Sequence, residues 1–327
     1  MEAASKHSER EIAPVEPTSA RAALRVKKAR TPELARGSSA AEAFQAIARS
    51  CLAHLLANVP VLQATHDPEA VHQMRVAVRR LRAALSLFRD VAADDEIPRL
   101  KDELRWFAGR LGEARDLDVF IAGTVTPARK TEPGDKGLAA LGAAYVRRRA
   151  AAYERALEAA GSERFRTLVA DVTNWIERGP WLKQGGKAVA RREEAVEDFA
   201  AGELSRRRKR VLKRGAHLAQ LEPLARHALR IAVKKLRYAA EFFAPLYAGQ
   251  GRRKRGKAFR ATLAELQERL GALNDLAVAG QITKGLQGPA AGAARRLAEG
   301  RRARLDEELA AAVEAHDALA KAEPFWR

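Results

Sequence analysis

A histidine and three arginines recur at helical spacing within residues 71–89 of the sequence. At ~100° per residue on a helix, they fall within about 80° of one another. We call this set the first basic stripe: His72, Arg75, Arg79 and Arg82. The face carries no acid, whereas a solvated helix face usually mixes charges, because acid–base pairs four residues apart stabilise the helix. Four such side chains repel one another unless an anion lies among them, so the stripe predicts an anion-binding surface.

The same pattern returns 155 residues further along, within residues 225–247. We call this copy the second basic stripe: His227, Arg230, Lys234 and Arg237. In both copies, apolar residues at helical spacing form another face, which favours a helix packed on a core. Two copies in matching register indicate a duplicated unit in which the basic face is the shared feature.

The composition fits a helical, anion-binding protein. The chain has 327 residues, a net charge of +19 and a 47% hydrophobic content dominated by good helix formers, which predicts an all-α protein with a polyanionic partner. Its single cysteine, Cys51, excludes an internal disulfide framework. No apolar run is long enough to span a membrane, and the first residues lack the apolar segment of a secretory signal. We therefore expect a cytoplasmic protein without a membrane partner.

Glycines, prolines and apolar spacing suggest how the chain is organised. A polar leader over residues 1–37 is expected to be mobile. Two helical halves are expected over residues 38–180 and 188–327, joined by a linker over 181–187. The expected boundaries within them are a helix over 100–111, loops over 123–137, 181–186 and 249–256, one helix over 188–215 and one final helix over 290–320.

A second repeated motif follows each stripe. Leu-Gly-x-x-Arg-Asp at residues 111–116 returns as Leu-Gly-x-x-Asn-Asp at residues 270–275, and Lys101 and Arg260 match at the same offset. Its last residue, Asp116 or Asp275, has two interpretations. It caps a short helix after Leu-Gly, which we favour, or it orients an arginine of the stripe through a salt bridge.

Together these two motif pairs resemble the CHAD domain, the conserved histidine α-helical domain, over roughly residues 38–320. The resemblance implies two four-helix bundles related by a pseudo-two-fold axis, with a basic central cleft that binds inorganic polyphosphate. It also implies attachment to polyphosphate granules. The ligand contacts that it implies are the eight residues of the two stripes, with Arg80, Lys235, Lys101 and Arg260 as further contacts.

The chemistry of the stripes agrees with that ligand. Arginine forks bind phosphate in a bidentate manner and lysine binds it as a point charge. The stripe histidines are expected to donate hydrogen bonds to phosphate oxygens. A basic nucleic-acid-binding protein is the alternative, but the aromatic content is only 6%, and single-strand binders usually interleave stacking rings with their cations. The basic runs at 206–210 and 252–255 are predicted to be solvated surface.

Metal and enzyme functions are less favoured. His72 and His227 have no acid or cysteine at ligand spacing within their motifs, so we predict neither a metal site nor a cofactor. The sequence has no phosphate-binding loop of the Gly-x-x-x-x-Gly-Lys type and no Gly-x-Ser-x-Gly motif. It also lacks the Glu-x-Glu-x-Lys start of the CYTH triphosphatase domains that often precede CHAD domains. A metal-chelating or phosphate-processing enzyme is therefore the least favoured alternative, and the protein is predicted not to be an enzyme.

Overall fold

Helices make up all the regular structure of the computed structural model, which describes residues 24–277, 285–302 and 305–327. Within those ranges the one β pairing is an isolated bridge between Ser39 and Ala195. The prediction of an all-α fold is confirmed. In the described part of the chain, no helix is both long and apolar enough to cross a membrane.

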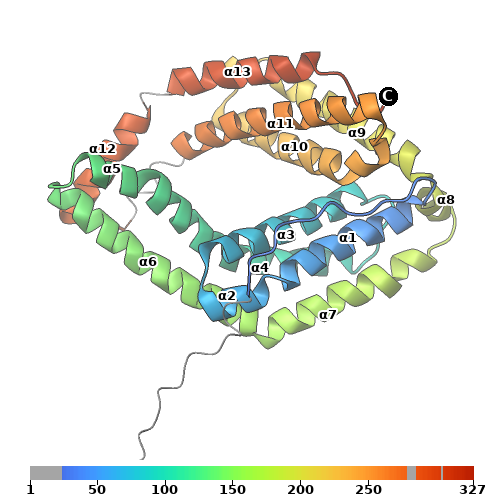
Figure 1. The fold of residues 1–327 in the computed structure, drawn as a ribbon, viewed down its shortest axis with the longest axis horizontal. Coiled ribbons are helices and arrows are strands. Elements are labelled where there is room, and N and C mark those ends of the chain that lie inside the picture. The colour runs from blue at the N-terminus through green and yellow to red at the C-terminus, as the bar shows by residue number, and fades with distance from the viewer. Residues whose placement is uncertain (1–23, 278–284, 303–304) are drawn as a thin grey trace, which may run out of the picture.

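The first basic stripe lies on α3, at the centre of the molecule (Figure 1). Asp67 caps this helix by accepting a hydrogen bond from the Glu69 backbone N–H at 2.8 Å, and Pro68 occupies the first turn, where a missing N–H costs nothing. The apolar face of α3 is fully buried against its neighbours. α3 (Pro68–Leu87) packs against α1 (Ala40–Leu56), α2 (Val59–Thr65) and α4 (Ile97–Phe120), and α7 (Glu163–Arg178) packs on α1 and α4.

The second basic stripe lies on α10, which packs between α9 and α11 and also against α3. These helices are α9 (Val196–Gly215), α10 (Pro223–Phe243), α11 (Gln250–Ala277) and α13 (Leu305–Lys321). Phe88, just after α3, stacks on Phe199 of α9 with ring centroids 4.8 Å apart and meets Phe243 of α10 at 5.9 Å. One continuous apolar core therefore joins the two halves. Their relation by a pseudo-two-fold axis stays a prediction.

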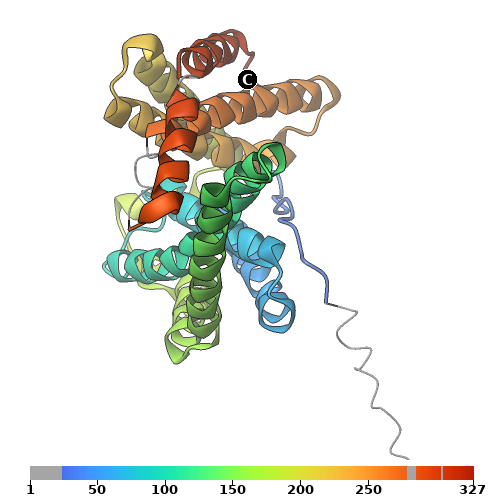
Figure 2. The same ribbon diagram turned by 90° about the vertical axis from the view of Figure 1, so that its left-hand side faces the viewer.

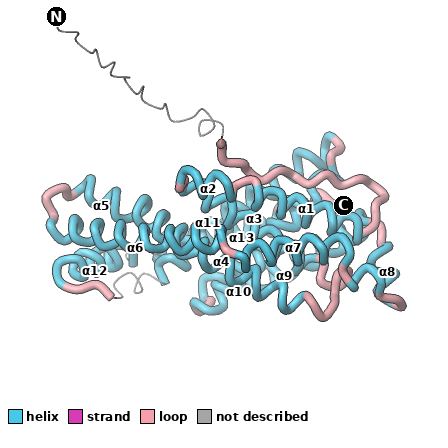
Figure 3. The backbone as a smooth tube through the Cα atoms, turned by 90° about the horizontal axis from the view of Figure 1, so that it is seen from below, coloured by secondary structure: helices cyan, strands magenta, loops and turns pink. Residues whose placement is uncertain are grey.

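A third group of helices extends from one end of the molecule (Figure 3), and this end faces the viewer in Figure 2. It contains α5 (Thr126–Thr131), α6 (Lys136–Gly161) and α12 (Gly288–Arg302). A small separate core, with Leu141 and Tyr145 of α6 and Ala293 of α12, holds it together. Because α12 follows α11 in the chain but packs on α6, the two halves of the sequence interlock here.

Several predicted boundaries are wrong, and over residues 111–137 the reason is that glycine and proline lie within helices instead of ending them. The helix expected to end at residue 111 continues to Phe120. The loop expected over 123–137 is a π-helical turn, Ile121–Val125, followed by α5, whose Pro127 lies in the first turn, where proline is tolerated. The other differences are a 3₁₀ turn at Pro180–Lys183, a break that separates α8 (Lys187–Glu193) from α9, a start of α11 at Gln250, and a last segment divided into α12 and α13.

Residues 24–37 of the predicted leader lie against the helices as an extended segment. The backbone N–H of Lys27 donates to Asn58 Oδ1 at 3.0 Å, and Asn58 Nδ2 donates back to the Lys27 carbonyl at 2.9 Å. The backbone N–H of Gly37 donates to the Glu197 carboxylate. This segment therefore crosses from α2 to α9. Residues 1–23 lie outside the described residues.

Candidate anion-binding site

The fold brings the two basic stripes together, because α3 packs on α10. Burial lowers the pKa of Lys234 to about 8, with further contributions from the charges of Arg230, Arg79, Arg75 and Arg237. Two of those four arginines belong to α3 and two to α10, so side chains of both stripes share one electrostatic environment. We call these five residues the central cation cluster.

The charges of this cluster are poorly compensated. Arg79 Nε and Arg230 Nε are buried and have no hydrogen-bond partner among the described residues. Arg75 Nη2 donates to Asp116 Oδ1 at 3.0 Å, but Asp116 is 71% exposed and its charge is shared with water. Burial lowers the pKa of Arg75, and although Asp116 opposes this shift, neighbouring arginines add to it. An anion bound among these side chains would remove a repulsion that the free protein bears.

The Leu-Gly-x-x-[Arg/Asn]-Asp motif supports the stripes from α4 and α11. Asp116 lies inside α4, so the prediction that it caps a helix is wrong, and the alternative, a salt bridge to a stripe arginine, is confirmed. A Cβ atom on Gly112 would collide with Arg75 Nη1, so this glycine makes room for the guanidinium. The equivalent carboxylate, Asp275, has a side chain outside the described residues.

The two stripe histidines lie beside the same motif. His227 Nδ1 lies 3.0 Å from Asn274 Oδ1 and donates to it, which leaves the other ring nitrogen for a ligand. Burial lowers the pKa of His72, and Arg115 adds to this effect while Glu69 opposes it. Arg115 and Asn274 occupy matching positions of the repeated motif and were not among the predicted site residues. The repeated motif includes both residues, but only its glycine and its aspartate were interpreted from the sequence.

The other predicted contacts are not among the charges that lower the pKa of Lys234. Arg82 is exposed near the end of α3, and Lys101 is half-buried on α4. Lys235 is exposed, and the charges near it differ from those near Lys234. Desolvation is the main cause that lowers the pKa of Lys235, and repulsion from cations that include Arg207 of α9 lowers it further.

Arg80 has an internal partner. Its side chain is 8% exposed, Nη1 donates to Glu241 Oε2 at 3.0 Å, and the guanidinium lies 4.9 Å from the centre of the Phe242 ring. Glu241 Oε1 also lies 3.4 Å from Arg237 Nε. This carboxylate therefore joins the central cation cluster to Arg80.

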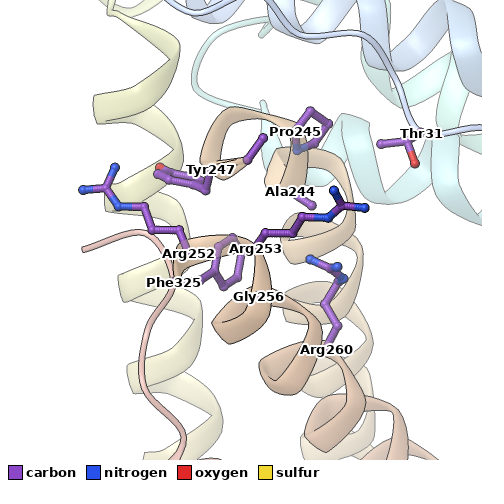
Figure 4. Close-up of a pocket in the computed structure, with 10 residues that line it drawn as sticks. Thr31, Ala244, Pro245, Tyr247, Arg252, Arg253, Gly256, Arg260 and Phe325 are labelled. Atoms are coloured by element: carbon purple, nitrogen blue, oxygen red, sulfur yellow. The ribbon is translucent and has the colours of Figure 1, made fainter. Parts of the chain in front are cut away.

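Arg260 lines two adjoining pockets beside that ion pair. One, of about 190 Å³, is also lined by Arg80, Glu241 and Arg30. The other, of about 230 Å³, is shown in Figure 4, where Arg253 and Arg260 extend on the same side, below Thr31. The pockets share Thr31, so the extended segment 24–37 forms part of both walls. Arginines 252 and 253 thus line a hollow, although their run was predicted to be solvated surface.

Replacing Glu241 by glutamine should destabilise the protein, because it leaves Arg80 with an uncompensated buried charge. Breaking a buried pair costs about 3–5 kcal/mol, and the partial exposure of Glu241 places the expected loss near 2 kcal/mol. Chemical denaturation would measure it. The matched control is Glu113→Gln, which breaks an exposed pair with Arg155 and should cost about 0.5 kcal/mol or less. Equal, small losses in both variants would mean that solvent, not Glu241, balances Arg80.

The fold and the site together define an all-α anion-binding protein built on two repeated His/Arg helices. The family model of the CHAD domain matches residues 46–284, and the chain belongs to the CHAD family. The crystal structure of the CHAD domain from the plant Ricinus communis is similar, with 33% identity, a TM-score of 0.76, and coverage of 90% of this chain and 97% of that one.

PptA from Streptomyces chartreusis shares the fold at 18% identity, with a TM-score of 0.62 and coverage of 85% of this chain and 99% of that one. No curated protein matches the sequence.

Proposed function

We propose that this protein binds inorganic polyphosphate at the central cation cluster, with the chain lying between α3 and α10. The observation that supports this most strongly is the set of five cations, contributed by both stripes, that share one electrostatic environment. Asp116 and Glu241 pair with Arg75 and Arg237, whereas the buried Arg79 Nε and Arg230 Nε have no hydrogen-bond partner among the described residues. Membership in the CHAD family, which is associated with polyphosphate binding, supports the same ligand.

Each type of side chain has a distinct part in this binding. The arginines offer planar forks to two phosphate oxygens, and Lys234 offers a point charge. His227 donates its Nδ1–H to Asn274 Oδ1, and when the ring is also protonated on its second nitrogen, that N–H can donate to a phosphate oxygen. Gly112 and Asp116 position Arg75 and are not themselves contacts. A flexible chain with about one negative charge per internal phosphate fits such a row, because no base or sugar has to be recognised.

Nucleic acid is the second candidate ligand, and the surroundings of the stripes disfavour it. Tyr238, which follows Arg237 in the second stripe's helix, is 5% exposed, and the Arg237 guanidinium lies 5.7 Å from its ring centre. A ring buried in this way has no face to offer to a base. The net charge of +19 would still attract nucleic acid nonspecifically.

We propose a binding module without catalysis, which attaches the protein to polyphosphate granules in the cytoplasm. Phosphoryl transfer depends on carboxylates that hold a metal ion, or on a positioned nucleophile, at the phosphates. The two carboxylates described in contact with the cluster are already engaged, Asp116 by Arg75 and Glu241 by Arg80 and Arg237. In the described part of the chain, no three His, Cys, Asp or Glu side chains gather as metal ligands do.

Competition between polyanions tests this function. Fluorescent single-stranded DNA bound to the protein should be displaced by polyphosphate at a far lower concentration of negative charge than the reverse exchange requires. Equal exchange in both directions would favour a general polyanion binder. Phosphate release during incubation with polyphosphate and Mg²⁺ would support an enzyme instead.

A further inference from the structure

The extended segment 24–37 is attached to the helices by different chemistry at its two ends. At the later end, the backbone N–H of Gly37 donates to the Glu197 carboxylate at 3.1 Å. At the earlier end, two buried polar side chains hold the backbone of Lys27. These are His54 and Asn58, which are 6% and 0% exposed. The earlier attachment therefore involves a titratable ring and the later one a carboxylate.

The hydrogen bonds around His54 fix which of its ring nitrogens carries the proton. Nε2 lies 3.0 Å from the Lys27 carbonyl oxygen and 3.1 Å from Gln73 Oε1. The Gln73 amide is oriented by Glu69, because its Nε2 donates to that carboxylate at 2.7 Å and an ionised carboxylate can only accept. Both atoms that face His54 Nε2 are therefore acceptors, so Nε2 carries the proton and Nδ1 of the neutral ring does not.

A second proton on this ring has no acceptor. His54 Nδ1 is buried and has no hydrogen-bond partner among the described residues. Protonation would place a charged N–H there without a partner, which is costly in a buried site. Desolvation is the main cause that lowers the pKa of His54, and it outweighs the opposing hydrogen bonds with Lys27 and Gln73. The ring in contact with Lys27 is therefore uncharged at neutral pH.

The charged groups around the ring do not reverse this preference. The positive charge of Arg80 on α3 also disfavours the imidazolium. On the segment itself, Lys27 adds another cation, while Glu69 is separated from the ring by the Gln73 amide. One turn earlier on α1, the Cys51 thiol is neutral, because burial raises its pKa to about 11.

The segment is the neighbour of His54 that moves most easily. Residues 24–31 are exposed except for Val26, which is half-buried, whereas α1 and α3 belong to the continuous core. Water therefore reaches the ring at the lowest cost if Lys27 leaves it. Residues 29–31 also form one wall of the pocket of about 190 Å³ that Arg80 and Arg260 line. The same movement would open this pocket.

We infer that residues 24–31 form a pH-sensitive cover, which uncharged His54 fastens at neutral pH and which is released in acid when His54 takes up a proton. This inference does not depend on the proposed function. A histidine in water has a pKa of about 6.5, and attachment of the segment lowers that pKa. Attachment is therefore strongest above pH ~6.5 and weakens as pH falls below it, by at most about thirtyfold at pH ~5.

The later end of the segment should stay in place over the same range. Burial raises the pKa of Glu197, but hydrogen bonds from backbone groups, with that of Gly37 the largest, and the nearby Arg36 outweigh this effect and lower it. The carboxylate is therefore still charged at pH ~5, where it continues to accept the Gly37 hydrogen bond. Gly37 is an internal control for release of the earlier end.

Amide hydrogen exchange, corrected for the intrinsic effect of pH, would measure both attachments at about pH 7.5 and about pH 5. The Lys27 amide reports on the earlier end, since it donates to Asn58 Oδ1. We expect its protection to fall about tenfold in acid, while that of Gly37 stays within about twofold. In His54→Gln, which keeps an N–H for the Lys27 carbonyl but does not titrate, this fall should disappear. The control His217→Gln changes an exposed histidine of the other half and should keep it.

Nuclear magnetic resonance of the His54 ring in the unchanged protein tests the same inference if His54→Gln fails to fold. The ring should be the neutral Nε2–H tautomer at pH ~7, and its protonation should coincide with the loss of Lys27 protection. Protection of Lys27 that is independent of pH, a fall that persists in His54→Gln, or a protonated ring with Lys27 still protected would overturn the inference. An equal loss of protection at Gly37 would also overturn it, because acid would then loosen the whole segment.

Discussion

Changing Arg79 and Lys234 together to alanine is expected to weaken polyphosphate binding about a hundredfold at ~0.1 M salt. The two residues lie on different stripes and share one electrostatic environment. Each contributes a charge-assisted contact of about 1.5 kcal/mol, and every 1.4 kcal/mol corresponds to a tenfold change in affinity. Calorimetric titration with polyphosphate of defined length would measure the change.

The variant with Lys209 and Lys213 changed to alanine serves as control, because it loses the same net charge at exposed positions of α9. It should bind within about twofold of the unchanged protein. Comparable losses in the two variants would mean that binding depends on overall charge and not on the stripes. Polyphosphate would then have no defined binding site on the protein.

Polyphosphate affinity is also expected to fall about tenfold between pH 7 and pH 10. Burial and neighbouring arginines lower the pKa of Lys234 in the free protein to about 8, from its ordinary value of 10.5. A bound polyanion stabilises the charged form and raises that pKa, so binding takes up a proton in this range. The affinity is therefore highest below pH 8, where Lys234 is already charged in the free protein, and it declines as the pH rises. The total decline is about tenfold for each unit by which binding raises the pKa of Lys234. Long chains are the suitable ligand, since their few terminal groups contribute little.

The variant Lys234→Arg isolates the residue responsible, because arginine stays protonated throughout this range. It should bind polyphosphate at pH 7 and lose most of the decline toward pH 10. His72→Gln with His227→Gln should retain that decline, because both changes leave the Lys234 ammonium in place. A decline that persists unchanged in Lys234→Arg would assign it to another group.

The sequence predicts the helices that carry the stripes because their apolar faces repeat with the helical period. That the two stripes meet was implied by the resemblance to the CHAD domain, which predicts a basic central cleft, and not by the helical period. The end of α4 could not be predicted in this way. A glycine within a helix costs about 1 kcal/mol, so Gly112 favours the prediction that the helix ends there. The sequence does not show that Gly112 is needed to make room for the Arg75 side chain.

The different surroundings of Lys234 and Lys235 could not be predicted from the sequence either, for another reason. Helical periodicity fixes which face of α10 each residue occupies, but the neighbouring helices decide what that face meets. Arg207 did leave a signal, because Phe199, Glu203, Arg207 and Val211 recur every four residues and are all buried on α9. The basic run around Arg207 obscured this pattern and led to the prediction of a solvated surface.

The salt dependence of polyphosphate binding tests the central claim most directly. If the five residues of the central cation cluster neutralise phosphates together, the logarithm of the binding constant should fall linearly with the logarithm of salt concentration. The expected slope is about −4, close to one for each neutralised phosphate. Titrations of the unchanged protein at several salt concentrations would provide it. A slope near zero would contradict the account, because binding would then not involve the basic stripes.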